Sequence, residues 1–170
     1  MRKTMMLMKI LLWSLAVFAV LAIALVLAGQ MGLFKGSAPQ NLGVRDGRLK
    51  PPSRTPNSVS SQAALDSDHP MREYAQLAPL PLHGDGAATL ARLRAIVQAL
   101  PGAKIVRSDP DYLYAQFTSR AMGFVDDTEF WFDPSAGAVQ VRSSSRVGRK
   151  DYGVNRARIE AIRAQLASAR

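Results

Sequence analysis

A long apolar run lies near the N-terminus and leaves few structures open to this part of the chain. From Ile10 to Gly29 every residue is apolar or small except Ser14. A helix of about twenty such residues is long enough to cross the hydrocarbon core of a bilayer. A helix of a soluble protein would need a polar face, which this run lacks. The run therefore predicts a transmembrane helix that contacts the lipid bilayer from Ile10 to Gly29.

The charges that flank this run predict its orientation. Arg2, Lys3 and Lys9 precede it, only Lys35 follows it closely, and no acidic residue occurs before Asp46. Because basic flanks are retained in the cytoplasm, the N-terminus is expected there. We therefore expect a signal-anchor over residues 1–35, in a single-pass protein of the inner (cytoplasmic) membrane. The C-terminal domain would then lie in the periplasm or outside the cell.

The run also has features of two cleavable signals. Val26-Leu27-Ala28 resembles the small-residue site of a secretory signal, so cleavage is the alternative to anchoring. Leu27-Ala28-Gly29-Gln30 has the shape of a lipoprotein signal. That form is excluded because the cysteine that would receive the lipid is missing.

The composition excludes several classes of site. With no cysteine, the chain has no disulfide, no thiolate nucleophile and no sulfur-ligated metal. Beyond residue 35 the chain has 18 basic and 13 acidic residues, a net charge of +5, and the two signs are interspersed. We expect no nucleic acid as a partner, because that partner usually meets a basic stripe or a known module. A mildly basic exported domain suits an anionic ligand or lipid headgroups better.

The rest of the chain divides into a tether and a domain. Residues 36–61 are rich in Gly, Pro, Ser and Asn, and four prolines forbid a long helix there. We expect this tether to hold the domain off the membrane, with its later part lying against the domain. The domain is expected over residues 62–170.

Within the domain, the apolar periodicity predicts a helix, four strands and a second helix. Asp85 is expected to cap a helix that Pro101-Gly102 ends, and Ile159, Ile162 and Leu166 mark one face of the last helix. Strands are expected over residues 103–107, 111–118, 127–132 and 138–143. Their turns are too short for parallel crossovers. We therefore predict an α+β fold in which an N-terminal transmembrane helix precedes a single domain, a four-stranded antiparallel meander flanked by two helices on one face.

An acidic cluster stands at the start of the third expected strand. On an extended chain Asp127 and Glu129 share one face and Asp126 lies on the other, so the three are not expected to hold a metal ion. Arg142 and Arg146 return on the next strand at about the right distance. This favours ion pairs, and a general acid/base pair is the alternative.

A serine-rich and basic segment joins the last strand to the last helix. Asn155 is expected as the N-cap of that helix, and free amides at a helix start attract anions. We expect an anion pocket there, and the alternative is that the arginines pair with nearby acids and hold the loop closed. The candidate ligand-binding residues are Asp126, Asp127, Glu129, Arg142, Ser143, Ser145, Arg146, Asp151, Asn155 and Arg156.

The sequence contains less evidence for a catalytic site than for a binding site. No Gly-x-Ser-x-Gly motif occurs, and His69 and His83 lie in loops rich in Pro and Gly, fourteen residues apart. The two histidines are expected at the surface, and neither a metal nor a cofactor is expected. The catalytic residues, if any, stay unknown.

Three segments resemble the family called domain of unknown function 1499, which occurs in bacteria and plastid-bearing organisms. They read NLGVRDGRLKPPSRTPNSVSSQA, GFVDDTEFWF and VRSSSRVGRKDYGVNRARIEAIR, and the resemblance runs from about Asn41 to Leu166. The family has no established activity, ligand or catalytic residue to carry over. Its members often have cysteines at the positions of Pro52 and Ser58, so the resemblance implies a structural or binding role here rather than thiol chemistry.

Together these features predict an uncharacterised membrane-anchored envelope protein whose exported domain binds an anionic small molecule or an envelope protein. The alternatives are a hydrolytic enzyme that uses the Asp/Arg cluster, or an accessory subunit of a membrane complex. In the last case Gly29 and Gly32 would allow close helix contacts.

Overall fold

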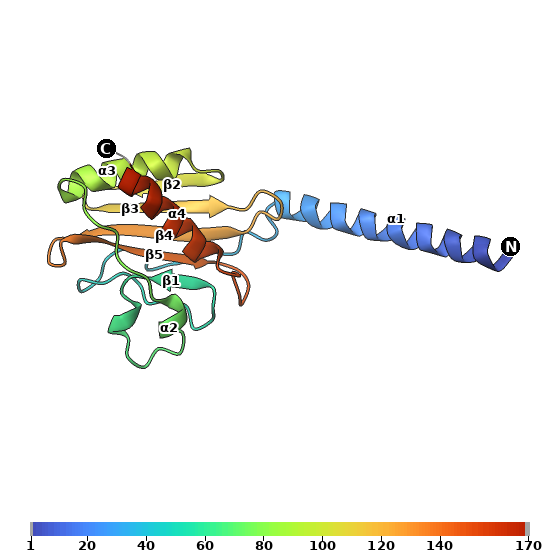
Figure 1. Cartoon of the computed structure of the whole chain (residues 1–170), viewed down its shortest axis with the longest axis horizontal. Helices are drawn as coiled ribbons and strands as arrows, with labels where there is room; N and C mark the ends of the chain where they lie inside the picture. The colour runs from blue at the N-terminus through green and yellow to red at the C-terminus, as the bar shows by residue number, and fades with distance from the viewer. Residues whose placement is uncertain (1, 169–170) are drawn as a thin grey trace.

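The computed structural model describes residues 2–168, in which a long helix projects from an α+β domain (Figure 1). The elements in chain order are α1 (Arg2–Gln30), β1 (Ser58–Ser60), η1 (Ala63–Leu65), α2 (Arg72–Ala75), α3 (Gly86–Ala99), β2 (Ala103–Ser108), β3 (Tyr112–Thr118), β4 (Val125–Asp133), β5 (Ala138–Ser145) and α4 (Val154–Ser168).

Helix α1 stands clear of the domain along most of its length. Its large apolar side chains are exposed, and Gly29 at its end is buried. By length and composition it is a helix able to cross a membrane, and a signal sequence meets the same criteria. It begins at Arg2, ahead of the apolar run, because nothing in the basic flank breaks a helix.

The strands of the described residues form one antiparallel sheet in the order β1-β5-β4-β3-β2. The predicted meander is confirmed for β2 to β5, but the sheet has five strands rather than four. The additional strand, β1, pairs with the outer edge of β5 and lies inside the expected tether. A segment of three residues just after Pro56 is too short for an alternation of apolar and polar residues to indicate a strand.

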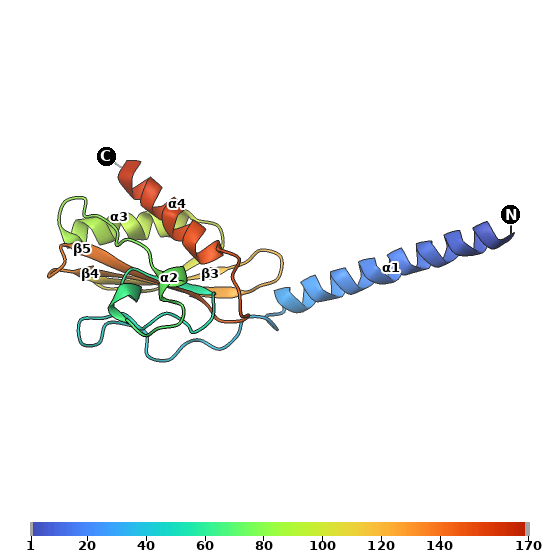
Figure 2. The same cartoon turned by 60° about the horizontal axis from the view of Figure 1, so that its bottom comes forward.

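Helices α3 and α4 cover one face of the sheet, as the sequence predicted (Figure 2). Asp85 caps α3, since its Oδ1 accepts a hydrogen bond from the N–H of Ala88 at 2.7 Å. The apolar core lies between these helices and the sheet. Its fully buried side chains include Leu93, Phe130 and Ile162.

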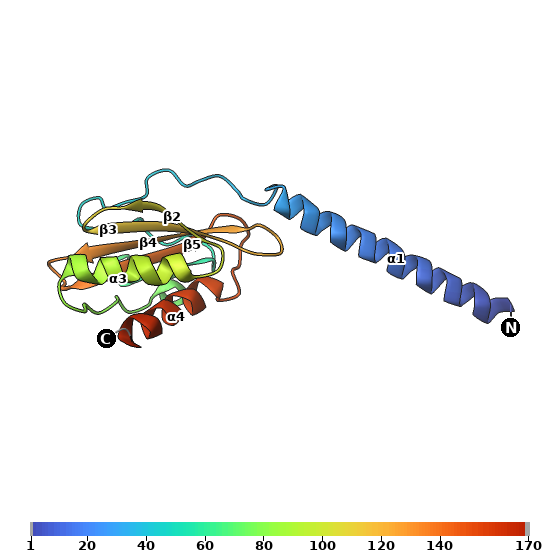
Figure 3. The same ribbon diagram turned by 90° about the horizontal axis from the view of Figure 1, so that it is seen from above.

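The opposite face of the sheet is covered by chain without regular structure, residues 41–53, which we call the coil. Figure 3 shows the segment that follows α1 running along the sheet on the side away from α3 and α4. Leu49 of the coil is buried with Tyr112, Tyr114 and Trp131 of the sheet. The later part of the tether thus lies against the domain, as expected, and makes the second sheet face an interior surface.

Candidate functional site

The acids of β4 alternate between the two faces of the sheet, as the strand period requires. Asp127 and Glu129 lie on the face under the coil, and Asp126 lies on the helix-covered face. Each carboxylate has an arginine partner there: Arg146, Arg142 and Arg158, respectively. The ion pairs expected for Arg142 and Arg146 are confirmed, and the third partner was not foreseen.

Glu129 and Arg142 face each other directly across β4 and β5. Glu129 Oε2 lies 3.5 Å from Arg142 Nη1, and the two side chains are 0% and 5% exposed. Glu129 Oε1 accepts hydrogen bonds of 2.7 Å from the N–H of Gly43 and from the hydroxyl of Tyr112. Arg142 Nε donates to the carbonyl of Pro51 at 3.3 Å. Glu129 thus contacts the coil at Gly43 and Arg142 contacts it at Pro51, so the pair holds the coil against the sheet.

Asp127 is held by a two-pronged contact with Arg146. Arg146 Nε and Nη2 each donate to one oxygen of Asp127 at 2.7 Å, the geometry of strong carboxylate–guanidinium pairs. The Tyr114 hydroxyl also donates to Asp127. Burial is the main cause that raises the pKa of Tyr114, and its hydrogen bond to Asp127 raises it further. The hydrogen bonds that Arg146 donates to Asp127 raise the pKa of Arg146. Both carboxylates under the coil are thus engaged as ion-pair partners, an arrangement that favours binding or structure over acid/base work.

Asn155 connects β5 to α4 on the helix-covered face. Its Oδ1 accepts from the hydroxyl of Ser143 at 2.6 Å, and its Nδ2 donates to Ser145 Oγ at 3.0 Å. Asp126 lies nearby, 2.6 Å from Arg158 Nη2. This second group of polar residues is separated from Asp127 and Glu129 by the sheet itself.

The start of α4 differs from the prediction in one respect. Asn155 lies inside the helix instead of capping it, and the acceptor at the helix start is Asp151. Its Oδ1 accepts from the N–H of Gly153 at 3.0 Å and its Oδ2 accepts from the N–H of Asn155 at 3.1 Å. The amides expected to attract an external anion are therefore filled by a carboxylate of the chain. The alternative expected arginines to hold this loop closed by pairing with acids; here Asp151 binds the helix amides and, in the described chain, its hydrogen bonds involve no arginine.

Asp151 also accepts a hydrogen bond from the hydroxyl of Tyr74. Burial and this contact raise the pKa of Tyr74 to about 12. For Asp151 burial is the largest effect and favours the neutral form, but the hydrogen bonds from Tyr74, Asn155 and Gly153 outweigh it and lower its pKa. Arg156 turns away from the acids, because its Nη2 donates to the carbonyls of Tyr74 and Gln76.

The ten candidate residues therefore form two groups rather than one. Under the coil lie Asp127, Glu129, Arg142 and Arg146; around the start of α4 lie Asp126, Ser143, Ser145, Asp151, Asn155 and Arg156. Sequence reasoning missed the contributions of Tyr112, Tyr114 and Arg158. The two tyrosines alternate with the core residues of β3, and that alternation was the available signal. The burial of this face could not be predicted, because the coil that covers it has no periodic pattern.

Between the coil and the end of β5 lies a cavity of 270 Å³, which we call the basic cavity. The coil and the residues before it contribute Ser37, Pro39, Lys50, Pro51, Pro52 and Ser53, and the sheet side contributes Asp127, Arg142, Ser144, Ser145 and Arg146. Three of the lining residues are cations and one is an acid. Among residues 2–168 no three His, Asp or Glu side chains are grouped so as to hold a metal ion.

Comparison with known proteins gives one match. A family model described as "Protein of unknown function (DUF1499)" matches residues 48–166, which is more than half of the chain. No curated protein and no solved structure matches the chain.

Proposed function

The chain belongs to this DUF1499 family of proteins of unknown function, and from that premise we propose that it is a membrane-anchored protein whose domain binds a small anion in the basic cavity. Helix α1 would serve as the anchor, with the N-terminus in the cytoplasm and the domain on the other side. The site differs from the one expected at the start of α4, where Asp151 takes the place of a ligand.

The observation that carries this proposal is the state of Arg142. Arg142 lines the cavity with its side chain only 5% exposed, and within residues 2–168 its Nη1 makes no hydrogen bond and has only the 3.5 Å ion-pair contact with Glu129 Oε2. Burial lowers the pKa of Arg142, and the nearby Glu129 and Asp127 oppose that effect. A buried N–H group that makes no hydrogen bond is costly, so an anion that accepts from the Arg142 guanidinium would recover part of that free energy.

Charge and size restrict the ligand. Asp127 and Glu129 offset two of the three cations, which leaves the charge of Lys50 free to attract an anion. Lys50 Nζ has only a long contact, 3.5 Å, to the carbonyl of Gln40. The cavity is smaller than the roughly 300 to 1,000 Å³ of sites for drug-sized molecules. It suits a phosphate group or a small carboxylate, with the hydroxyl of Ser144, opposite Asp127 on the coil side, as a further donor.

A titration of the full-length protein in detergent with inorganic phosphate tests this proposal. We expect the amide resonances of Ser53, Ser144 and Ser145 to shift with saturation. Lys50→Gln should weaken phosphate binding about tenfold, because a hydrogen bond to a charged group contributes about 1.5 to 3 kcal/mol. Lys104→Gln, on the exposed opposite edge of the sheet, is the matched control and should leave binding unchanged.

Two results would contradict the cavity as the site. One is the absence of any shift at millimolar phosphate, and the other is a shift confined to residues 153–158 at the start of α4. The anchor is tested separately. Intact mass of the protein recovered from membranes should include residues 1–35, whereas a cleaved signal would leave a chain that starts near residue 29.

A further inference from the structure

We propose that the end of the domain from which α1 leaves is a docking surface for anionic lipid headgroups. This inference rests on the proposed anchoring by α1. The surface consists of three segments, residues 31–36, 119–124 and 146–153, which we call the membrane-facing end.

The end of α1 contacts the domain directly. Gln30 Nε2 donates to the carbonyls of Arg120 and Ala121 at 2.6 and 3.0 Å. Gly29 lies so close to the backbone of Met122 that a Cβ built on it would be 2.4 Å from the Met122 carbonyl oxygen. A helix joined to the domain at these points leaves no flexible spacer between them. With this junction the domain would lie directly against the membrane, whereas the sequence predicted that residues 36–61 hold it off.

The segment after α1 continues this contact into the third segment. The rings of Phe34 and Phe124 lie 5.7 Å apart. Gly36 lies against Arg146 and Val147, since a Cβ on it would be 2.7 Å from Val147 Cγ2. All three segments therefore surround the point where α1 leaves. If α1 crosses a bilayer, the headgroups on the domain's side lie against them.

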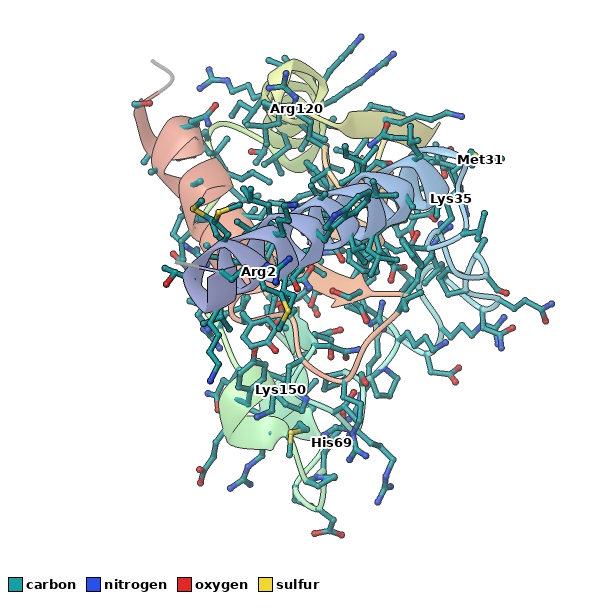
Figure 4. All side chains as sticks on the ribbon, turned by 90° about the vertical axis from the view of Figure 1, so that its right-hand side faces the viewer. Arg2, Met31, Lys35, His69, Arg120 and Lys150 are labelled. Atoms are coloured by element: carbon teal, nitrogen blue, oxygen red, sulfur yellow. The ribbon has the colours of Figure 1, made fainter. Side chains whose placement is uncertain are left out.

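The charges of the membrane-facing end have one sign at the surface. Lys35, Arg120, Arg149 and Lys150 are exposed, and Figure 4, which looks along α1 toward the domain, shows Lys35, Arg120 and Lys150 placed around the helix. The three segments contain one acid, Asp151, which is buried and bound to the start of α4. Lys and Arg held within a Debye length of an anionic leaflet are attracted to it.

Exposed apolar side chains stand among these cations. Met31 is 80% exposed, Leu33 is 68% exposed and Tyr152 is 92% exposed. Tyrosine is enriched at membrane–water interfaces, where its ring enters the headgroup layer and its hydroxyl stays wet. Within the described residues no part of the chain covers these side chains. A layer of anionic headgroups would cover them and would also complement the surrounding positive charges.

Because the chain has no cysteine, single cysteines with an environment-sensitive label test the docking cleanly. The protein is the full chain in vesicles of phosphatidylcholine with about 30% phosphatidylglycerol. Tyr152→Cys reports on the membrane-facing end, and Ser135→Cys, in the exposed β4–β5 turn, is the matched control. Accessibility of each label to iodide is compared before and after the acidic lipid is replaced by phosphatidylcholine.

We expect the label at position 152 to be at least fivefold less accessible than the label at 135 in acidic vesicles. This protection should fall in phosphatidylcholine vesicles, and also when Lys35, Arg120, Arg149 and Lys150 are all changed to Gln. Equal accessibility at 152 and 135 in acidic vesicles would overturn the docking surface. Protection that appears only in native membranes would overturn it in favour of a protein partner.

The same samples separate this inference from the anchoring on which it rests. Flotation of the vesicles after alkaline carbonate shows whether α1 is inserted. Protein that floats but has an accessible position 152 retains its anchor and refutes the docking, whereas protein that is stripped by carbonate refutes both. Binding of phosphate in the basic cavity is measured in detergent and depends on neither result.

Discussion

Asp151 connects the start of α4 to α2 through one carboxylate. It accepts hydrogen bonds from backbone groups at the start of α4, from the side chain of Asn155 and from Tyr74, which belongs to α2. A carboxylate in this position satisfies amides that a helix start leaves free and complements the helix dipole. A single residue thus closes a site that the sequence offered to an external anion.

Asp151→Asn should lower the free energy of unfolding by about 2 kcal/mol, because the helix loses a charged cap and one acceptor becomes a donor. Unfolding in urea of the full chain in detergent would show it, with Trp13→Phe as background so that the buried Trp131 alone reports fluorescence. Asp111→Asn is the control, since Asp111 is exposed and should change stability by less than about 0.5 kcal/mol. Equal effects of the two substitutions would show that the cap contributes nothing.

The buried pair of Glu129 and Arg142 makes a second prediction at this scale. Arg142→Met leaves Glu129 buried without its counter-charge and should cost about 3 to 5 kcal/mol. Adding Glu129→Gln should recover at least half of that loss, because Gln Oε1 still accepts from Gly43 and Tyr112. Urea unfolding of both single variants and the double variant measures the coupling. A loss that is the same in the double variant as in Arg142→Met would refute the buried pair.

At the scale of elements, sequence reasoning succeeded where apolar periodicity was strong. The alternation in β3 to β5 and the helical spacing of Leu90, Leu93 and Val97 predicted the meander and the helix face. The sequence did not predict that residues 58–60 form a strand, or which face of the sheet the coil covers. Three strand residues and a Pro-rich segment have no apolar periodicity of their own. Their positions depend on long-range contacts, such as that of Leu49 with the sheet.

The dependence on long-range contacts also explains which parts of the candidate site could be predicted. The alternation of Asp126 with Asp127 and Glu129 follows from the strand period, and their separation by the sheet could be predicted. The basic cavity could not, since Lys50 and Arg142 are distant in sequence and meet only when the coil folds over β5. The capping role of Asp151 was missed because Asn and Asp are about equally good N-cap residues and Asn155 lies nearer to the apolar periodic positions.

The junction between α1 and the domain allows a prediction about an element as a whole. Gly29→Ala places a methyl group against the backbone of Met122, so the loop 119–124 should separate from the end of α1. Trypsin should then cleave after Arg120 several-fold faster in the full-length protein in detergent. Ala24→Val, on the exposed part of α1, adds more volume without meeting the domain and should leave cleavage unchanged. An unchanged rate in Gly29→Ala would show that the loop does not rest on the helix.

At the scale of the molecule, the polar interior predicts how stability depends on pH. Hydrogen bonds lower the pKa of Asp133 and Asp151 against the opposing effect of burial. Their contribution is therefore complete above about pH 4, the ordinary carboxyl value, and is lost as the pH falls through the lower folded values. Burial, together with the neighbouring carboxylates, raises the pKa of Tyr74, Tyr112 and Tyr114. Below about pH 10 these tyrosines contribute in full, and above it the unfolded chain ionises first, so stability falls.

Each of these tyrosines should steepen the alkaline loss by up to about 1.4 kcal/mol per pH unit. Tyr112→Phe removes a hydrogen bond to Glu129 and should cost about 1 to 2 kcal/mol at pH 7, yet it should flatten the decline between pH 10 and 12. Tyr152→Phe, at a side chain that is 92% exposed, should leave the curve unchanged. Urea unfolding followed from pH 3 to 12 with Trp131 fluorescence gives the three curves. Parallel alkaline limbs for the native chain and Tyr112→Phe would show that the hydroxyl under the coil meets water, and that the second face of the sheet is not an interior surface.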